Sequence, residues 1–350
     1  MSYLEYGLFA FVLALLVTPV VRHFAFRVGA IDVPRAPRNL HTNTVAKLGG
    51  LAIFLAVGLS ILLSIYTGTI DPLIIPFKFV WATLIGGAVL MIGGFLDDKY
   101  DLPPYILIIF PTVASLIVVL SGIGVGIKSI SNPFGAPISL DFFLLGIPAS
   151  GIFIFLWMMG MMFTTKFLDG LDGLVAGIGL IAGLTLFALS LTESVQQPIT
   201  ASFAIILVGA LAGYLVYAFN PASIFLGEGG STLIGFILGV LSVILGGKIA
   251  TALLVMGIPI LDVAWVILQR LWFRQSPFRG DRLHIHFRLI DLGFTQRQTA
   301  LLLYGLSAVF GFTAVFLQSK GKLVALGILV SIMVLLVLLV VRMYRKKQHS

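Results

Sequence analysis

The chain has 350 residues, of which 59% are hydrophobic and only 10% are charged, and its mean hydropathy is +1.11. This composition excludes a soluble globular domain and predicts an all-α, polytopic protein that resides in a lipid bilayer. The absence of cysteine excludes disulfides, iron–sulfur clusters and thiol catalysis. The formal net charge of +8 suits a membrane protein with basic cytoplasmic turns, and we expect no nucleic-acid partner.

Eleven segments are long and apolar enough to cross a bilayer as helices, each of which needs about 20 residues. Segments such as 323–341 are continuously apolar, whereas the strands of an outer-membrane barrel alternate. We therefore expect one transmembrane domain over 1–350 that ends in a basic tail, 342–350, at the membrane surface. The expected spans are 4–21, 48–66, 79–96, 103–120, 142–162, 174–191, 199–217, 233–247, 250–268, 300–317 and 323–341.

The distribution of basic residues predicts the orientation of these spans. The first span is preceded by the acidic residue Glu5 and by no basic residue, so we expect a retained helix and no cleaved signal peptide. By the positive-inside rule, the turns after odd-numbered spans are cytoplasmic, the N-terminus is outside and the protein crosses the inner (plasma) membrane. Segment 122–141, rich in Gly, Ser and Pro, is expected outside, with a hairpin as one possible form. The Lys residues expected on the outer side are Lys78, Lys128, Lys248, Lys320 and Lys322.

Carboxylates are concentrated in the expected cytoplasmic turns. A carboxylate close to hydrocarbon is energetically costly, so its presence there indicates a function. Asp97 and Asp98 end the third span. Adjacent carboxylates offer hard oxygen ligands for Mg²⁺, and their mutual repulsion raises one pKa, which suits a base. For an isolated Asp pair, two solvated acids at a helix end are the simpler interpretation.

A second acidic pair, Asp169 and Asp172, precedes the sixth span. If this segment is helical, the two carboxylates lie on one face. Gly170 and Gly173 between and after them allow a ligand to approach the backbone closely. The alternative is a solvated helix start, where an acid is favourable beside the helix dipole.

Two further cytoplasmic turns carry polar groups. The glycine-rich turn 227–231 leads directly into an apolar helix, and its backbone N–H groups could receive phosphate. His284 and His286 lie in a basic loop, where isolated histidines are more often structural than catalytic. Asp262 lies inside the ninth span, so it is a functional candidate, with a structural hydrogen bond or ion pair as an equal alternative.

In this order along the chain, these segments resemble the motifs of the polyprenyl-phosphate N-acetylhexosamine-1-phosphate transferases. That family is related to phospho-N-acetylmuramoyl-pentapeptide transferase. The resemblance extends from His41 to Tyr304, and the expected eleven spans are similar to the hexosamine branch. The matching motifs are His41…Leu48-Gly-Gly, Gly94-x-x-Asp-Asp, Asp169-Gly-Leu-Asp-Gly-Leu, Phe225-Leu-Gly-x-x-Gly-Ser and Ser276-Pro-Phe-x-x-Asp-Arg-x-His-x-His.

The resemblance implies transfer of a sugar 1-phosphate from a UDP-sugar to undecaprenyl phosphate, with release of UMP. It implies Mg²⁺ as cofactor, for which Mn²⁺ could substitute, and a first membrane step in making envelope glycans such as lipopolysaccharide or teichoic acid. The turn Ala46-Lys-Leu-Gly-Gly is similar to the hexosamine branch, which favours UDP-N-acetylglucosamine, whereas the pentapeptide branch has a Pro-Thr-Met-Gly-Gly turn.

The resemblance also implies roles for individual residues. Asp97 and Asp98 match the acidic pair that activates the lipid phosphate, and Asp98 also lies near the metal. Asp169 and Asp172 match the acids of the nucleotide-sugar site, and Glu228 matches the metal-binding carboxylate. His284 completes the implied catalytic set. The implied substrate-binding residues are Lys47, Lys166, Asn220, Phe225, Arg279, Arg282, His286 and Arg288.

Three positions depart from the family pattern. Glu228 stands where Asp is usual, Lys166 stands where Asn is usual, and Phe287 replaces the second of two adjacent histidines of the hexosamine branch. Glutamate still offers hard oxygen ligands. We therefore expect a working but retuned site, in which these departures affect the choice of sugar more than the type of reaction.

Other interpretations stay open at this stage. A secondary transporter would place polar groups near the midplane in repeated halves, which this sequence does not show. A non-catalytic homologue and a pentapeptide-type transferase are further alternatives. The sequence does not distinguish direct in-line transfer from a two-step route through an aspartyl intermediate, and it leaves a homo-oligomer possible.

Overall fold

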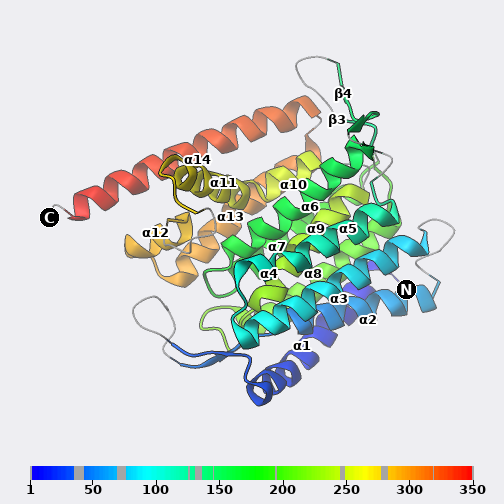
Figure 1. Ribbon diagram of the computed structural model, residues 1–350, viewed down its shortest axis with the longest axis horizontal. Coiled ribbons are helices and arrows are strands. Elements are labelled where there is room, and N and C mark those ends of the chain that lie inside the picture. The colour runs from blue at the N-terminus through cyan, green and yellow to red at the C-terminus, as the bar shows by residue number, and fades with distance from the viewer. Residues whose placement is uncertain are drawn as a thin grey trace.

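The computed structural model describes residues 2–34, 43–68, 76–124, 127–130, 136–144, 146–193, 195–244, 249–276, 283–317 and 319–348. In these residues the protein is a bundle of long helices with short strands in its connections (Figure 1), as the all-α prediction requires. The helices are α1 (Tyr3–Val28), α2 (Gly49–Tyr66), α3 (Phe77–Tyr100), α4 (Pro104–Leu107), α5 (Ile109–Ser121), α6 (Ala149–Leu168), α7 (Leu174–Ser190), α8 (Pro198–Ala218), α9 (Gly227–Ile244), α10 (Ile249–Val255), α11 (Gly257–Trp272), α12 (Ile285–Asp291), α13 (Gln296–Phe316) and α14 (Ser319–Gln348).

The helix lengths are those of a polytopic membrane protein. Within the described part of the chain, eight helices are long and apolar enough to span a bilayer: α1, α2, α3, α4 with α5, α6, α8, α9 and α13. Helix α7 is apolar but shorter. Helices α10 and α11 satisfy the criteria together but meet at an angle of 79°, so the expected continuous span at 250–268 is bent in the structure. Each of the eleven expected spans overlaps a helix or a pair of helices.

The predicted hairpin in the segment 122–141 is present. Strand β3 (Ser129–Ile130) pairs with β4 (Ile138–Ser139) in antiparallel register, and β5 (Phe143–Leu144) pairs with β6 (Ile147–Pro148) directly after them. Strands β3 and β4 lie at one end of the bundle in Figure 1. The two chain termini lie at opposite ends of the bundle.

Helices α8 and α9 form the centre of the bundle, where most of their residues are buried. Helix α1 packs along α8, while α3 and α6 pack along α9. Glycines bring the backbones together, as is common between membrane helices. A Cβ atom on Gly50 of α2 would lie 2.2 Å from Cα of Gly230, and one on Gly94 of α3 would lie 2.3 Å from Cα of Gly229.

These contacts make a prediction about stability. Gly50→Ala is expected to lower the free energy of unfolding by about 1–3 kcal/mol, because its methyl group meets backbone atoms of α9 that have little room to move. Gly58→Ala in the same helix is the control, because its Cβ would meet only Leu84 Cδ2 at 3.6 Å. Thermal unfolding of both variants in detergent measures the effect. Equal melting temperatures for the two variants would contradict the proposed close contact.

Candidate functional site

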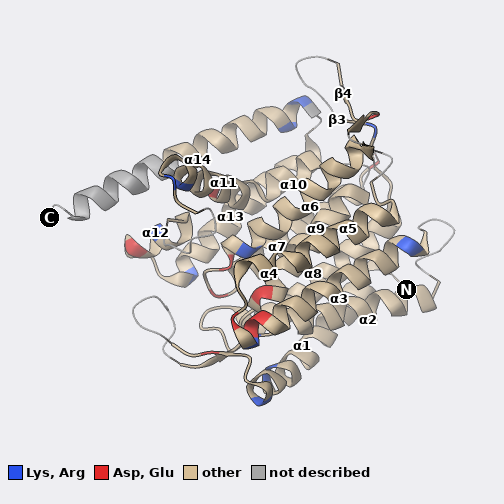
Figure 2. Ribbon diagram, viewed as in Figure 1, with Lys and Arg blue, Asp and Glu red and all other residues tan. Residues whose placement is uncertain are grey.

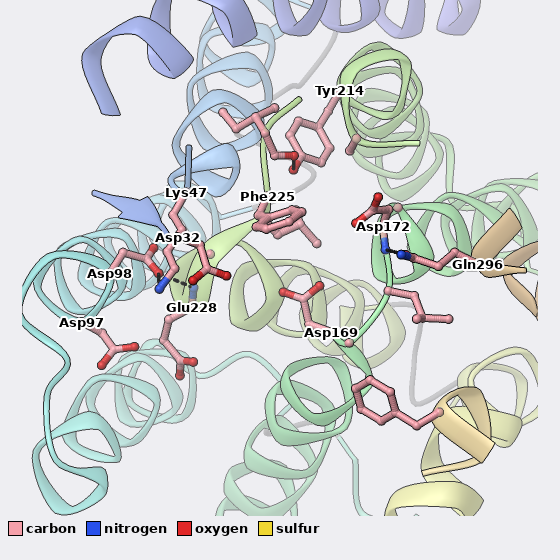
Figure 3. A pocket seen from close by; sticks show the side chains of 18 residues that line it. Asp32, Lys47, Asp97, Asp98, Asp169, Asp172, Tyr214, Phe225, Glu228 and Gln296 are labelled. Atoms are coloured by element: carbon pink, nitrogen blue, oxygen red, sulfur yellow. Dashed lines mark hydrogen bonds and ion pairs between the residues drawn. The ribbon is translucent and has the colours of Figure 1, made fainter. Parts of the chain in front are cut away.

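A polar cavity of about 360 Å³ lies at one end of the bundle, where Figure 2 shows the acidic residues gathered. Its wall is built from segments that are far apart in the sequence: the α1–α2 connection, the end of α3, the α6–α7 connection and the start of α9. Figure 3 shows their side chains around a common space. The polar residues that line it are Asp32, Lys47, Asp97, Asp98, Asp169, Asp172, Tyr214, Glu228 and Gln296.

Main-chain hydrogen bonds hold two of these segments together. Strand β1 (Ile31–Asp32) pairs with β2 (Val45–Ala46), and the carbonyl of Ala46 accepts a hydrogen bond from the N–H of Phe225 at 2.8 Å. The carbonyl of Phe225 in turn accepts from the N–H of Gly49 at 2.9 Å. This network fixes Phe225, Asp32 and Lys47 on the same wall of the cavity.

Asp98 connects the end of α3 to the start of α9. Its side chain is 4% exposed, and Oδ1 accepts a hydrogen bond from the N–H of Glu228 at 3.3 Å. Lys47 Nζ lies 4.0 Å from the same oxygen. The N–H at the start of the glycine-rich helix, which the sequence suggested as a phosphate-binding group, is therefore used by Asp98. Asp97 accepts the N–H of Leu102 at 2.9 Å.

The condition under which Asp169 and Asp172 would share a helical face is not met. Helix α6 ends at Leu168 and α7 begins at Leu174, so the two acids lie in the non-helical connection between them. Both still line the cavity. Asp172 Oδ2 accepts hydrogen bonds from Asn220 Nδ2 at 2.8 Å and from the N–H of Ala222 at 3.0 Å, which ties this connection to the α8–α9 connection.

Asp169 points into the cavity (Figure 3). Its side chain is accessible there, but the surrounding protein weakens its hydration. This desolvation, followed by repulsion from Glu228, Asp98 and Asp172, raises the pKa of Asp169 well above its usual value. A carboxylate in such surroundings is stabilised by any cation that enters the cavity.

Helix α13 holds the α6–α7 and the α8–α9 connections by hydrogen bonds. Gln296 Oε1 accepts the N–H of Asp172 at 3.4 Å, and Arg297 Nε donates to the carbonyl of Asn220 at 2.7 Å. The hydroxyl of Tyr304 donates to the carbonyl of Gly173 at 2.6 Å. The acidic α6–α7 connection is thus held on two sides, which fits a site whose charged groups must keep their positions.

Two lysines offset part of the negative charge. Lys166 Nζ, in the last turn of α6, lies 2.5 Å from Glu228 Oε1 in the first turn of α9. Lys47 Nζ lies near Asp98, 4.0 Å from its Oδ1. Acidic residues outnumber basic ones among the described lining residues, so the cavity remains favourable for a further cation.

The donor set is suitable for Mg²⁺, although it forms no complete cage. Asp98 and Glu228 offer hard carboxylate oxygens on one wall, with Asp169 nearby. Among the described residues, no group of three or more acidic or histidine side chains is close enough to hold a metal alone. Mg²⁺ usually binds proteins through one or two carboxylates and takes its other ligands from phosphate and water. Asp98 and Glu228 fit that pattern.

The structure places His284 against Asp262, outside the residues that line the cavity. Asp262 Oδ2 lies 2.8 Å from His284 Nδ1, and Oδ1 accepts the N–H of Ile285 at 2.9 Å. Both side chains are buried. The structural alternative for Asp262 is therefore confirmed: it attaches the start of α12 to α11 and orients the histidine ring.

We expect Asp262→Ala to release this attachment. The lost hydrogen bonds to buried groups cost about 1–3 kcal/mol, so the segment before α12 should become sensitive to protease. Trypsin cleavage after Arg274, measured on folded protein, tests this expectation. Asp141→Ala, at an exposed acid that follows β4, is the control. A cleavage rate for Asp262→Ala equal to that of the control would contradict the assignment.

Of the remaining predicted residues, Asn220, His286 and Arg288 are not among those that line the cavity. His286 is buried, and its ring stacks on that of His284 with centroids 5.6 Å apart. Asn220 contacts Asp172, and Arg288 lies in α12. Arg279 and Arg282, like His41, fall outside the described residues.

Sequence reasoning missed three polar lining residues, Asp32, Tyr214 and Gln296. Asp32 carried a usable signal, because it is an acid in the same expected cytoplasmic turn as Lys47. Tyr214 gave no signal in the sequence, because it lies within an apolar helix. In the structure it lines the cavity, and its hydroxyl donates to the carbonyl of Ile224 at 3.2 Å.

An apolar groove of about 340 Å³ adjoins the polar cavity. It lies between α1, α2, α3 and the start of α9, and Asp98 lines both spaces. Gly50, Gly94, Gly229 and Gly230 form part of its wall, where the helix backbones approach closely. The large apolar residues that line the groove are Phe24, Leu48, Leu51, Met91, Ile92, Phe95, Leu96 and Leu226.

The acidic cavity at the end of the helical bundle adjoins an apolar groove. This arrangement is suited to a membrane protein that binds a polar molecule and a lipid side by side. Comparison with known proteins agrees. Residues 80–246 match the model of glycosyl transferase family 4. The chain belongs to this family, because it also shares 30% identity over most of its length with relatives named as polyprenyl-phosphate N-acetylglucosamine-phosphate transferases.

Three relatives represent these similarities. A Bacillus subtilis protein named probable undecaprenyl-phosphate N-acetylglucosaminyl 1-phosphate transferase is 30% identical over 87% of this chain and 82% of its own. The decaprenyl-phosphate N-acetylglucosaminephosphotransferase of Mycobacterium tuberculosis is 30% identical over 88% of this chain and 80% of its own. The undecaprenyl-phosphate alpha-N-acetylglucosaminyl 1-phosphate transferase of Haemophilus influenzae is 28% identical over 85% and 81%.

Proposed function

We propose that this protein transfers N-acetylglucosamine 1-phosphate from UDP-N-acetylglucosamine to undecaprenyl phosphate and releases UMP. The names of its relatives support the sugar and the polyprenyl acceptor. The observation that carries the proposal is the position of Asp98, which lines both the polar cavity and the apolar groove. A reaction between a water-soluble nucleotide sugar and a lipid phosphate needs such a junction.

The groove is suited to the isoprenoid part of the acceptor. Phe24 and Ile92 are exposed on the outside of the bundle, where lipid would surround them, and Leu226 lies at the inner end. A chain bound there would bring its phosphate to Asp98 and Lys47 without exposing hydrocarbon to water. Because the isoprenoid chain comes from the bilayer and not from water, the groove contributes packing contacts and shape, and not a hydrophobic transfer free energy.

In the proposed reaction, an oxygen of the lipid phosphate attacks the sugar-proximal phosphorus of the donor. The bond from that phosphorus to the bridging oxygen breaks, and UMP leaves with this oxygen. Asp98 accepts a proton from, or orients, the attacking phosphate. Lys47 and Lys166 supply positive charge to the phosphates, while Phe225 offers its ring to the uracil. Bound Mg²⁺, held by Glu228 and Asp98, would neutralise charge on the leaving UMP.

We also propose eleven spans with the N-terminus outside, the C-terminus in the cytoplasm and the site at the cytoplasmic face of the inner membrane. Support comes from a helix or helix pair at each expected span and from termini at opposite ends of the bundle (Figure 1). The basic residues after odd-numbered spans support the same orientation.

The decisive experiment measures radiolabelled UMP release from UDP-N-acetylglucosamine by purified protein, with and without undecaprenyl phosphate. Release that requires both the lipid and Mg²⁺ is expected. A panel of UDP-sugars, including UDP-N-acetylmuramoyl-pentapeptide, identifies the donor. A lack of release with every donor would support a non-catalytic homologue and overturn the proposal. Exchange of UMP into the donor without lipid would instead indicate an aspartyl intermediate.

A further inference from the structure

Lys166 forms an ion pair with Glu228, one of the carboxylates that line the cavity. Its ammonium group lies 2.5 Å from Glu228 Oε1, in the most direct lysine–carboxylate contact of the described cavity region. The contact joins the last turn of α6 to the first turn of α9. The two side chains are only 23% and 17% exposed, so water screens their attraction less than it would at the surface.

The ammonium of Lys166 also acts on a second acid. Its positive charge attracts the carboxylate of Asp97 as well as that of Glu228. Lys166 therefore attracts carboxylates of both α3 and α9 and offsets part of their mutual repulsion. A divalent cation directed to Glu228 would meet this ammonium at the same carboxylate, where two positive groups repel each other.

We propose that Lys166 is an internal counter-ion that occupies Glu228 in the free protein and moves to the donor diphosphate when the nucleotide sugar binds. The divalent cation then binds firmly only together with the donor. This inference rests on the proposed function, because it assumes a donor that carries a diphosphate. It makes Lys166 a positioning residue that couples the binding of metal and substrate.

The chemistry of lysine is suited to this exchange. A lysine ammonium is a compact charge with three donors on a flexible stem, so it can leave one anion for another. The donor diphosphate offers more negative charge than a single carboxylate. Once Lys166 contacts phosphate, both oxygens of Glu228 become available to the metal.

Binding of Mn²⁺ alone tests the proposal without any turnover. Free Mn²⁺ is measured by electron paramagnetic resonance while it is titrated into purified parent protein and into Lys166→Gln. Removal of one positive charge at this distance is expected to tighten Mn²⁺ binding at least roughly tenfold, which corresponds to about 1.4 kcal/mol. Lys99→Gln, an equal change of charge in the last turn of α3, is the matched control and is expected to bind as the parent does.

Two further variants identify the group on which Lys166 acts. Lys166→Gln combined with Glu228→Gln should lose the gain in affinity, and Lys166→Arg should keep the weak binding of the parent. Addition of UDP-N-acetylglucosamine, corrected for Mn²⁺ bound by the donor alone, should strengthen binding much more in the parent than in Lys166→Gln.

Unchanged Mn²⁺ affinity in folded Lys166→Gln would overturn the inference, and so would an equal gain in Lys99→Gln, which would indicate a general effect of net charge. Failure of the proposed function is distinguishable from either result, because it would show as absent UMP release by the parent protein. The Mn²⁺ titration without donor does not depend on that outcome.

Discussion

Asp98→Asn is expected to lower the rate of sugar-phosphate transfer by about 10³-fold or more, in the range that a positioned general base contributes. The amide has nearly the same shape and can still accept the N–H of Glu228, so the contact between α3 and α9 is preserved. It cannot take a proton from the lipid phosphate, and it offers a poorer ligand to Mg²⁺. Purified protein, assayed for UMP release at saturating donor and lipid, measures the loss.

Asp101→Asn provides the control for this prediction. Asp101 lies three residues further on, at the end of α3 and outside the residues that line the cavity, with a positive φ of 49° that asparagine tolerates. The activity of the Asp101→Asn variant should equal that of the parent within about twofold, because a substitution of a solvent-exposed residue usually has a small effect. Turnover by folded Asp98→Asn at the rate of Asp101→Asn would remove Asp98 from the reaction.

The second large effect is expected at Glu228. Glu228→Ala removes both carboxylate oxygens from the proposed metal site and leaves Lys166 without its partner. Activity should fall by roughly 10²–10³-fold, the loss typical when a group that stabilises transition-state charge is removed. Titration of activity with Mg²⁺ should show the remaining turnover with a much weaker dependence on the metal.

Glu228→Asp separates the charge from the length of the side chain. Aspartate keeps the hard oxygen ligands, so the variant should remain active, with an altered Mg²⁺ concentration at half-maximal rate. A Mg²⁺ titration of Glu228→Ala that overlays that of the parent would show that this carboxylate is not a ligand.

The helical architecture and the meeting of distant segments could be predicted because membrane burial restricts both. Apolar length locates helices, and the positive-inside rule assigns turns to a side, so segments as distant as Asp98 and Glu228 were expected together. The structure places them around one cavity with Asp169 and Asp172. The Gly-, Ser- and Pro-rich hairpin was predictable for a similar reason, since turn residues interrupt apolar runs.

Tertiary contacts decided the features that sequence reasoning missed. The span at 250–268 is apolar apart from a few residues such as Asp262, and its mean hydropathy contains no information about the 79° angle between α10 and α11. Asp169 and Asp172 have helical spacing, but hydrogen bonds from Asn220 and Ala222 hold the acids in an irregular connection. Only the structure shows that both oxygens of Asp262 are used by α12.

The shared position of Asp98 gives the two reactants separate entrances. Undecaprenyl phosphate would arrive and depart through the apolar groove, within the membrane plane. The nucleotide would exchange with the aqueous compartment through the polar cavity. Neither reactant then obstructs the other, so the kinetics should follow a ternary-complex pattern. For the same reason, a bisubstrate inhibitor would need an acyl or prenyl tail joined to a uridine head by a linker that passes this one carboxylate.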